Sequence, residues 1–312
     1  MATDQPPDQP PDQPADQLAG DPATDRPVLV MGEALVDVVL DPDGGRREMP
    51  GGSAANVAVA LARLGRPVRF ATSYARDRLG GLVADHLAAS GVEHAGDPRV
   101  LARTSTAEAT LAPDGSASYV FDLEWRLGPL PDLTPRAVHV CSIGAVLDPG
   151  RHDVLAALER FGDAALVTYD VNVRPSITGT GPEVVERVER VAALADVVKA
   201  SDEDLEALWP GLGEAGTAQH LLGLGASGVV VTRGASGAAW YDGRGVTEVG
   251  AVLLGVADTI GAGDTFSAGI LDALWDDPDR DRAEVLAHAA RLAAVTVSRP
   301  GADPPWRHEV ER

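Results

Sequence analysis

The chain has 312 residues, 45% of them hydrophobic, and a formal net charge of −21 at pH 7. This length and apolar content support one large α/β domain with a sizeable core, whereas the acidic balance argues against nucleic acid or an anionic membrane as a partner. A single cysteine, Cys141, excludes an internal disulfide and a cysteine-based metal site, and the sequence holds no run of about 18 apolar residues that could span a membrane.

The first 26 residues repeat Asp-Gln-Pro at a four-residue step. Because this stretch is acidic, rich in proline and almost without large apolar side chains, it cannot bury a core, and we expect a disordered tail. It also lacks the apolar segment of a signal peptide, so we expect a soluble cytoplasmic protein. Residues 27–312 form the expected folded domain.

The first half of this domain mixes helices with extended segments. We predict a strand at 28–31, a helix from the glycines at 51–52 to Gly65, a strand at 67–72, a helix at 79–89 and a strand at 137–141. The stretches 33–50 and 100–125 show short β runs with turns, including a hairpin turn at 113–115. We expect these two stretches to form a small β lid at the edge of the main sheet.

In the second half, strands and helices alternate. The pattern predicts helix 151–161, strand 165–169, helix 183–194, strand 196–199, helices 202–208 and 215–223, strand 228–232, a hairpin turning at 242–243, a strand into Asp258, a helix from Ala262 and a last helix at 282–297. Such alternation implies a mostly parallel sheet with helices on both faces.

The stretch from Asp258 to Asp264 opens one of these helices with a glycine-rich turn. Backbone N–H groups at Gly261, Ala262 and Gly263 would form an anion site at the positive end of the helix dipole. Asp264, in the first turn, could accept the proton of an alcohol that attacks a phosphoryl group. The stretch therefore indicates phosphoryl transfer to a hydroxyl, although a tight turn followed by an acid that only complements the dipole is the alternative.

Other polar residues follow the carboxyl ends of predicted strands, where open parallel sheets bind ligands. They come from five segments: Asp37; Asp170, Asn172 and Arg174; Lys199; Thr232, Gly234 and Gly237; and Asp258. The sequence Asp-Val-Asn-Val-Arg places three polar side chains on one face of an extended segment, either as ligand contacts or as a solvated strand end. The convergence of five segments favours a binding site.

Two short motifs have a structural interpretation beside the functional one. Ser201 and Asp204 have the spacing of a helix capping box, and Asp204 could in addition orient a hydrated Mg²⁺. Ser53 could cap the helix that follows Gly52, or this turn could serve a ligand, with Asn56 and the glycine backbone touching a sugar hydroxyl.

Two stretches resemble the signatures of the ribokinase-like (PfkB-type) carbohydrate kinases. Residues 258–264 are similar to the C-terminal signature of that family, and residues 51–65 are similar to its N-terminal one. The resemblance covers about residues 28–308. It implies a three-layer α/β/α sandwich with a mostly parallel central sheet and a β lid, and a kinase that depends on ATP and Mg²⁺.

The resemblance also implies roles for individual residues. Asp264 would be the catalytic base, and the backbone of residues 261–264 would be the anion hole. The sugar would be held by Asp37, Gly52, Asn56, Asp170, Asn172 and Arg174, and the nucleotide by Lys199, Ser201, Thr232, Gly234, Gly237 and Ser298. Asp204, one methylene shorter than the usual Glu of the family, would hold Mg²⁺ through water, and Asp258 would belong to a K⁺ site.

Within the family, residues 32–37 and 170–175 look most like fructokinases, and Ser53 stands where ribokinases have Lys. The Asp-x-Asn-x-Arg pattern also occurs in 2-keto-3-deoxygluconate kinases, where the arginine can serve an acidic sugar. We therefore expect a primary hydroxyl of a small sugar, fructose first, to receive the γ-phosphoryl group of ATP. The alternatives are 2-keto-3-deoxygluconate, another sugar or a nucleoside, or a non-catalytic sugar sensor. Lids of this family often pair, which implies a homodimer.

Overall fold

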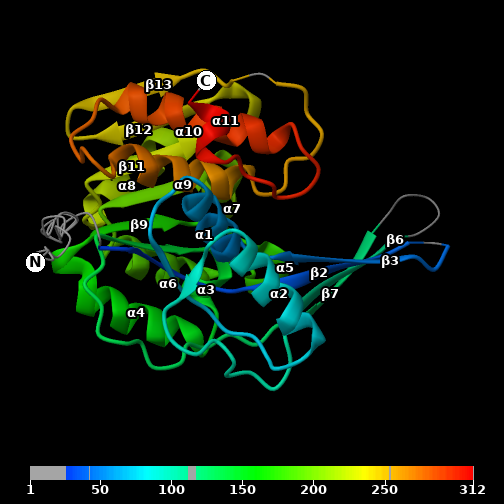
Figure 1. The fold of residues 1–312 in the computed structure, drawn as a ribbon. Coiled ribbons are helices and arrows are strands. Elements are labelled where there is room, and N and C mark those ends of the chain that lie inside the picture. The colour runs from blue at the N-terminus through cyan, green and yellow to red at the C-terminus, as the bar shows by residue number, and fades with distance from the viewer. Residues whose placement is uncertain (1–25, 42, 112–116, 253, 312) are drawn as a thin grey trace, which may run out of the picture.

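The computed structural model describes residues 26–41, 43–111, 117–252 and 254–311 (Figure 1). The expected tail, apart from Arg26, and the expected turn at 113–115 lie outside the described residues. In the described ranges, no helix has both the length and the apolar character needed to cross a membrane.

A nine-stranded sheet forms the centre of the molecule, with the order β13-β12-β11-β10-β9-β8-β1-β4-β5. Neighbouring strands from β11 to β5 in this order are all parallel. At the other edge, β12 is antiparallel to both β11 and β13. The strands are β1 (Val28–Met31), β4 (Val68–Ala71), β5 (Glu93–His94), β8 (Ala137–Cys141), β9 (Leu166–Asp170), β10 (Val197–Ser201), β11 (Gly228–Thr232), β12 (Ala238–Asp242) and β13 (Gly245–Val249).

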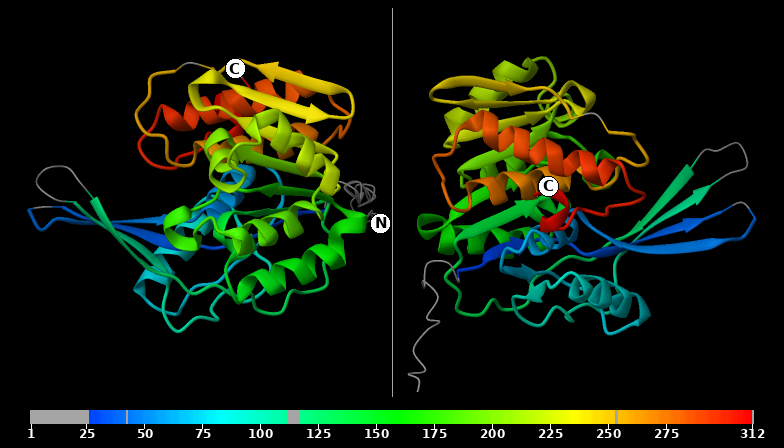
Figure 2. Two further views of the ribbon diagram at one scale, coloured as in Figure 1. Left: turned by 180° about the vertical axis from the view of Figure 1, so that it is seen from behind. Right: turned by 45° about the horizontal axis from the view of Figure 1, so that its top comes forward.

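Helices cover both faces of this sheet, so the predicted three-layer α/β/α fold is confirmed (Figures 1 and 2). Alternate residues of one strand enter different cores: Val28 and Val30 pack with α1 (Ser53–Arg63), α2 (Arg78–Ala89) and α9 (Ala262–Leu274), whereas Leu29 and Met31 pack with the helices of the opposite face. Burial on both faces explains the continuous apolar runs of the strands.

The remaining helices are short to medium in length. They are α3 (Ser142–Val146), α4 (Gly150–Phe161), α5 (Pro175–Thr178), α6 (Pro182–Ala192), α7 (Asp202–Leu208), α8 (Gly213–Leu224), α10 (Arg282–Val297) and α11 (Arg307–Val310). Residues of α4, α6, α7 and α8 enter the core opposite α1 and α9, while α10 packs beside α9.

A second, four-stranded sheet projects from the body of the molecule like an arm (Figure 2). It has the order β3-β2-β6-β7, with β2 (Leu35–Leu40), β3 (Arg46–Gly51), β6 (Thr106–Leu111) and β7 (Ala117–Asp122). We call these four strands the projecting sheet. They match the two stretches for which the sequence predicts β structure, 33–50 and 100–125, except that β3 ends one residue later, at Gly51.

The predicted strand into Asp258 is wrong for the described residues of that segment. Residues 254–258 are irregular, and the N–H groups of Ala257 and Asp258 donate to the carbonyl of Val297 at the end of α10. Leu254 and Val256 are 48% and 73% exposed. The backbone of this segment thus bonds to the end of α10, and the segment belongs to neither sheet.

Candidate active site

Helix α9 begins at the glycine-rich turn that the sequence singled out. Gly261 has a φ of 75°, and a Cβ there would lie 2.6 Å from the Cβ of Ala302, so the position requires glycine. The N–H groups of a first helical turn lack partners within the helix and face the positive end of its dipole. This turn can therefore bind an anion such as a phosphate.

Asp264 lies in that first turn and is 6% exposed. Ser53 donates from Oγ to Asp264 Oδ1 at 2.6 Å, and Asn56 donates from Nδ2 to Oδ2 at 2.8 Å. Burial raises the pKa of Asp264, while the hydrogen bonds from Ser53 and Asn56 oppose that rise. Each carboxylate oxygen retains a lone pair, so Asp264 can still accept the proton of a bound hydroxyl.

Ser53 does not cap α1, contrary to the structural interpretation of its motif. The N-cap residue is Gly52, with a φ of 105°, and no side chain caps the helix. A Cβ at Gly52 would lie 2.6 Å from the carbonyl oxygen of Glu33, so only glycine allows this close approach. The Ser53 hydroxyl turns instead to Asp264.

Glu33 is a buried acid of the site that the sequence reasoning missed. Its side chain accepts hydrogen bonds from the backbone N–H of Ser53 and of Gly144, each at 3.1 Å, and thereby joins the start of α1 to α3. Burial raises the pKa of Glu33 to about 7. Its position just after β1, at the carboxyl end of a central strand, was the signal that could have identified it.

A buried ion pair lies beneath the anion-binding turn. Lys199 donates from Nζ to Asp170 Oδ2 at 2.7 Å, and Ser267 donates to the same oxygen at 2.9 Å. A Cβ on Gly263 would lie 3.2 Å from Lys199 Nζ, which places the ammonium group directly against the first turn of α9. Asp170 is fully buried, so it lies below the surface of the site, and Lys199 adds positive charge to the turn.

The segment after β9 does not place its polar side chains on one extended face, so that expectation is corrected. Asn172 has a left-handed φ of 37°, which breaks the alternation. Its Nδ2 donates to Ser53 Oγ at 2.9 Å, and its Oδ1 accepts from Arg174 Nη1 at 2.6 Å. Arg174 is exposed, whereas Asp170 is internal.

Ser201 and Asp204 form the capping box of α7, and the structural interpretation of this motif is confirmed. Asp204 also accepts a hydrogen bond from the N–H of Val173 at 2.8 Å. Each of its oxygens keeps a lone pair for water, so a water-mediated contact with Mg²⁺ stays a prediction. No group of three or more His, Cys, Asp or Glu side chains in the described ranges could hold a metal ion by itself.

The residues expected on the nucleotide side lie at the ends of neighbouring elements. Thr232 pairs in register with Ser201 on the next strand, and a Cβ at Gly237 would lie 2.0 Å from the carbonyl oxygen of Val249. Gly234, which begins the short turn after β11, has a φ of 51°. Ser298 is exposed, and its hydroxyl bonds to the Val295 carbonyl at the end of α10.

Two predicted carboxylates lie at the margins of the site. Asp258 accepts from the N–H of Ile260 at 3.0 Å and of Gly301 at 2.9 Å, which ties the turn before α9 to the C-terminal loop. Asp37, on β2, is half-buried, and burial raises its pKa to about 6 while the Arg174 charge opposes that rise. Asp37 is therefore close enough to Arg174 to be influenced by its charge.

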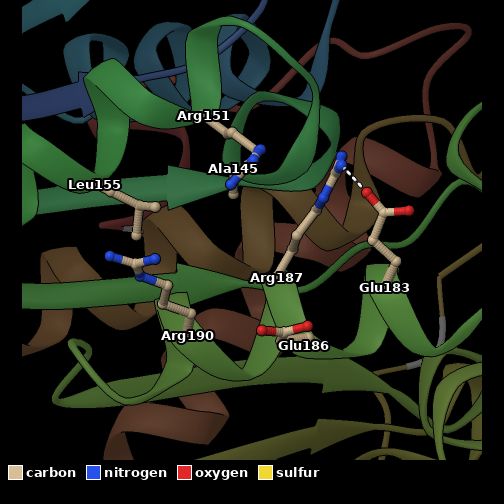
Figure 3. Close-up of a pocket in the computed structure, with 7 residues that line it drawn as sticks. All are labelled: Ala145, Arg151, Leu155, Glu183, Glu186, Arg187 and Arg190. Carbon is tan, nitrogen blue, oxygen red and sulfur yellow. Dashed lines mark hydrogen bonds and ion pairs between the residues drawn. The ribbon is translucent and has the colours of Figure 1, made fainter.

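A surface pocket of about 240 Å³ lies elsewhere, between α3, α4 and α6 (Figure 3). It is lined by Ala145, Arg151, Leu155, Glu183, Glu186, Arg187 and Arg190. Arg187 and Glu183, one turn apart on α6, form an ion pair in its lining, and none of the lining residues is a candidate site residue. The pocket thus marks a separate surface.

Comparison with known proteins gives consistent findings. The sequence matches the model of the pfkB family of carbohydrate kinases over residues 25–309. A fructokinase from Rhizobium leguminosarum bv. trifolii is 36% identical over 264 residues, which cover 80% of this chain and 80% of that protein.

Solved structures with the same fold include two kinases in complex with ATP or an ATP analog. Fructokinase from Xylella fastidiosa with bound ATP has a TM-score of 0.77 and 29% identity, covering 89% of this chain and 94% of that one. Aminoimidazole riboside kinase from Salmonella enterica, complexed with aminoimidazole riboside and an ATP analog, has a TM-score of 0.78 and 28% identity, covering 89% and 95%.

Proposed function

This chain belongs to the pfkB family of carbohydrate kinases, and from that premise we propose that it phosphorylates a primary hydroxyl of fructose, with Asp264 as the base. The family that the two signatures resemble is confirmed, and the chain is an ATP-dependent sugar kinase. Fructose is proposed because the Rhizobium and Xylella relatives are fructokinases.

One observation carries the assignment of the base: Asp264 is buried in the first turn of α9 and is flanked by hydrogen-bond donors from α1. Water is largely excluded from it, and the anion-binding N–H groups of the same turn lie within one helical turn of its carboxylate. In a phosphoryl transfer, the base can accept the proton of the attacking hydroxyl while the nearby anion site stabilises the charge on the transferred phosphoryl group.

The proposed step balances as follows. The sugar O–H bond breaks and its proton goes to Asp264, while the sugar oxygen forms a bond to the γ-phosphorus and the bond to the leaving oxygen of ADP breaks. The turn at 261–264 and the Lys199 ammonium beside Gly263 stabilise the negative charge on the transferred group. The projecting sheet would cover the sugar and keep water from hydrolysing ATP.

We place the nucleotide over the ends of β10 and β11, close to the turn that opens α9. Thr232, Gly234 and Gly237 lie at the end of β11, and the exposed apolar side chains of Leu254, Val256 and Ile260 offer a surface for a flat base. The substrate would be MgATP, in which phosphate oxygens and several water molecules coordinate the ion, and Asp204 would contact the ion through one of these waters. The proposal also places a K⁺ ion near Asp258.

The proposal also covers the cellular location of this protein and its oligomeric state. A kinase that consumes ATP needs a compartment in which ATP is maintained, so we place this protein in the cytoplasm. We also propose a homodimer in which projecting sheets pair.

An acidic sugar is the second candidate substrate because Arg174 is exposed beside Asn172 and could pair with a carboxylate. A nucleoside is the third candidate because the Salmonella relative binds aminoimidazole riboside. A sugar sensor would need no buried base at the anion turn, so the position of Asp264 counts against that alternative.

The test is ADP release from MgATP with fructose, tagatose, ribose, 2-keto-3-deoxygluconate and nucleosides as separate acceptors. We expect fructose to exceed every other acceptor by at least about tenfold in kcat/KM. The variant Asp264→Asn should lose a factor on the order of 10² to 10⁴ in kcat while it still binds sugar.

The matched control is Glu284→Gln, which removes an exposed acid from the first turn of α10. Its turnover should equal that of the unmodified protein, because a dipole-complementing acid outside the site has no part in the chemistry. Turnover that survives in Asp264→Asn would overturn the assignment of the base, and a different preferred acceptor would replace fructose.

A further inference from the structure

A one-way chain of hydrogen bonds ends on the carboxylate of Asp264. Arg174 Nη1 donates to Asn172 Oδ1 at 2.6 Å, and Asn172 Nδ2 donates to Ser53 Oγ at 2.9 Å. Ser53 Oγ then donates to Asp264 Oδ1 at 2.6 Å. The chain joins the segment after β9 to the first residue of α1 and then to the first turn of α9.

The chemistry of the members fixes the direction of this chain. A guanidinium group only donates, so the Asn172 atom that it contacts must be the amide oxygen, and the amide nitrogen must face Ser53. Ser53 Oγ therefore accepts a hydrogen bond from Asn172 and donates one to Asp264. Asp264 accepts at both oxygens, at Oδ1 from Ser53 and at Oδ2 from Asn56, and hydrogen bonds donated to both oxygens favour its ionised form.

We infer that Ser53 is a positioning residue that holds Asp264 ionised and oriented for catalysis. The inference rests on the proposed function, in which Asp264 takes the proton of the sugar hydroxyl. Bonds in one direction polarise each other, and here the far end is a permanent positive charge. Ser53 thus transmits the influence of an exposed arginine to a buried base.

The surroundings of Asp264 explain why such support matters. The charged and titratable groups that face it are Glu33, Cys141, Asp170, Lys199 and, through the chain, Arg174. Burial and the nearby Asp170 carboxylate raise the pKa of Asp264, whereas Lys199 and the donors Ser53 and Asn56 lower it. Without the Ser53 hydroxyl, more of the buried carboxylate would be protonated and unable to accept the substrate proton.

The test compares the pH dependence of kcat/KM in the unmodified protein, in Ser53→Ala and in Ser53→Thr. Loss of one hydrogen bond to a charged group should move the acid limb of Ser53→Ala upward by about one pH unit, with roughly tenfold lower activity below the limb and partial recovery above it. Ser53→Thr keeps the hydroxyl and should restore the original limb. A merely structural role would lower activity evenly at all pH values.

A second measurement does not depend on turnover. The infrared C=O band of protonated Asp264, identified as the band lost in Asp264→Asn, should titrate at a higher pH in Ser53→Ala than in the unmodified protein. Coincident titrations and coincident acid limbs would overturn the inference, as would a Ser53→Thr profile equal to that of Ser53→Ala. If no sugar is phosphorylated, the proposed substrate fails, yet the infrared titration still decides whether Ser53 acts on Asp264.

Discussion

Two buried carboxylates, Asp264 and Glu33, share the centre of the site but have different hydrogen-bond partners. Asp264 accepts from two side chains of α1, whereas Glu33 accepts from two backbone N–H groups, one in α1 and one in α3. Burial raises the pKa of both, and that of Glu33 reaches about 7. Glu33 is therefore an acid whose charge changes within the working pH range.

Glu33 should make the stability of the protein fall as pH rises towards neutrality. Its pKa increases from 4.5 to about 7 on folding, so between these values the folded state binds a proton that the unfolded state has lost. The resulting penalty is absent below the lower value and complete above the upper one. It should reach at most about 3 kcal/mol.

Glu33→Gln removes this titration and tests its sign. The free energy of unfolding of both proteins is measured by urea denaturation across this pH range. The value for the variant minus the value for the unmodified protein should increase as pH rises. The absolute stability of the variant can be lower, because a glutamine has one acceptor oxygen for two N–H donors. A difference between the two proteins that is constant with pH would contradict the prediction.

At the scale of elements, α9 is fixed at both ends. Its start is held by the turn at Gly261 and by the contacts of Asp264, and its last part is held by Asp272, which is 3% exposed. Asp272 accepts from Arg66 at 2.6 Å, from Arg307 at 3.0 Å and from His288 at 2.8 Å. These partners come from the loop after α1, from α11 and from α10, so one carboxylate joins three segments to α9.

Asp272→Asn should therefore destabilise the fold by about 3 kcal/mol, since it leaves the partly buried Arg66 and Arg307 without their buried counter-charge. The hydrogen bonds and charges around it hold the pKa of Asp272 well below its usual range, so this stabilisation is present at neutral pH and is lost as the carboxylate becomes protonated in acid. The measurement is the free energy of unfolding at pH 7 and at about pH 3, where the deficit of the variant should shrink.

The matched control is Asp276→Asn, because Asp276 pairs with the same Arg66 but is 71% exposed. Its loss should cost roughly 0.5 kcal/mol or less. Equal effects of the two variants would show that the burial of Asp272 does not matter.

Helices, strands and turns could be predicted from the sequence where the local residue pattern reflects the burial or backbone conformation of the element in the fold. The central strands have continuous apolar runs because both faces are buried, and the turn at 261–264 is identified by its glycines alone. Residues 254–258 do not form the predicted strand because their backbone bonds to the end of α10, a tertiary contact that the local sequence does not encode. The position of Glu33 after β1 marks it as a candidate, but its bond from Gly144 and the bond from Ser53 to Asp264 join segments about 100 to 200 residues apart, so no local pattern predicts these contacts.

At the scale of the whole molecule, the projecting sheet exposes an apolar face next to the site. Met49 is opposite Asp37 in the register, Asp37 is opposite Ala107, and Ala107 is opposite Phe121, so all four share one face. Tyr119 lies two residues from Phe121, on the same face, and the two rings stack with centroids 6.1 Å apart. Met49 and Tyr119 are 40% and 62% exposed, which suits a surface that a second copy covers.

The dimer proposal predicts that a charge on this face separates the copies. Tyr119→Asp should weaken self-association by roughly 2 kcal/mol, about thirtyfold in Kd, because a buried unpaired carboxylate would replace a large aromatic contact. Sedimentation velocity should show a dimer for the unmodified protein and a shift towards monomer for the variant. Val120→Asp is the matched control, since Val120 is 64% exposed but points to the opposite face of the sheet. Equal shifts for the two variants, or an unmodified protein that sediments as a monomer, would contradict pairing through the face that carries Asp37. Because that face also borders the sugar site, weakened association should raise KM for the sugar more than it lowers kcat.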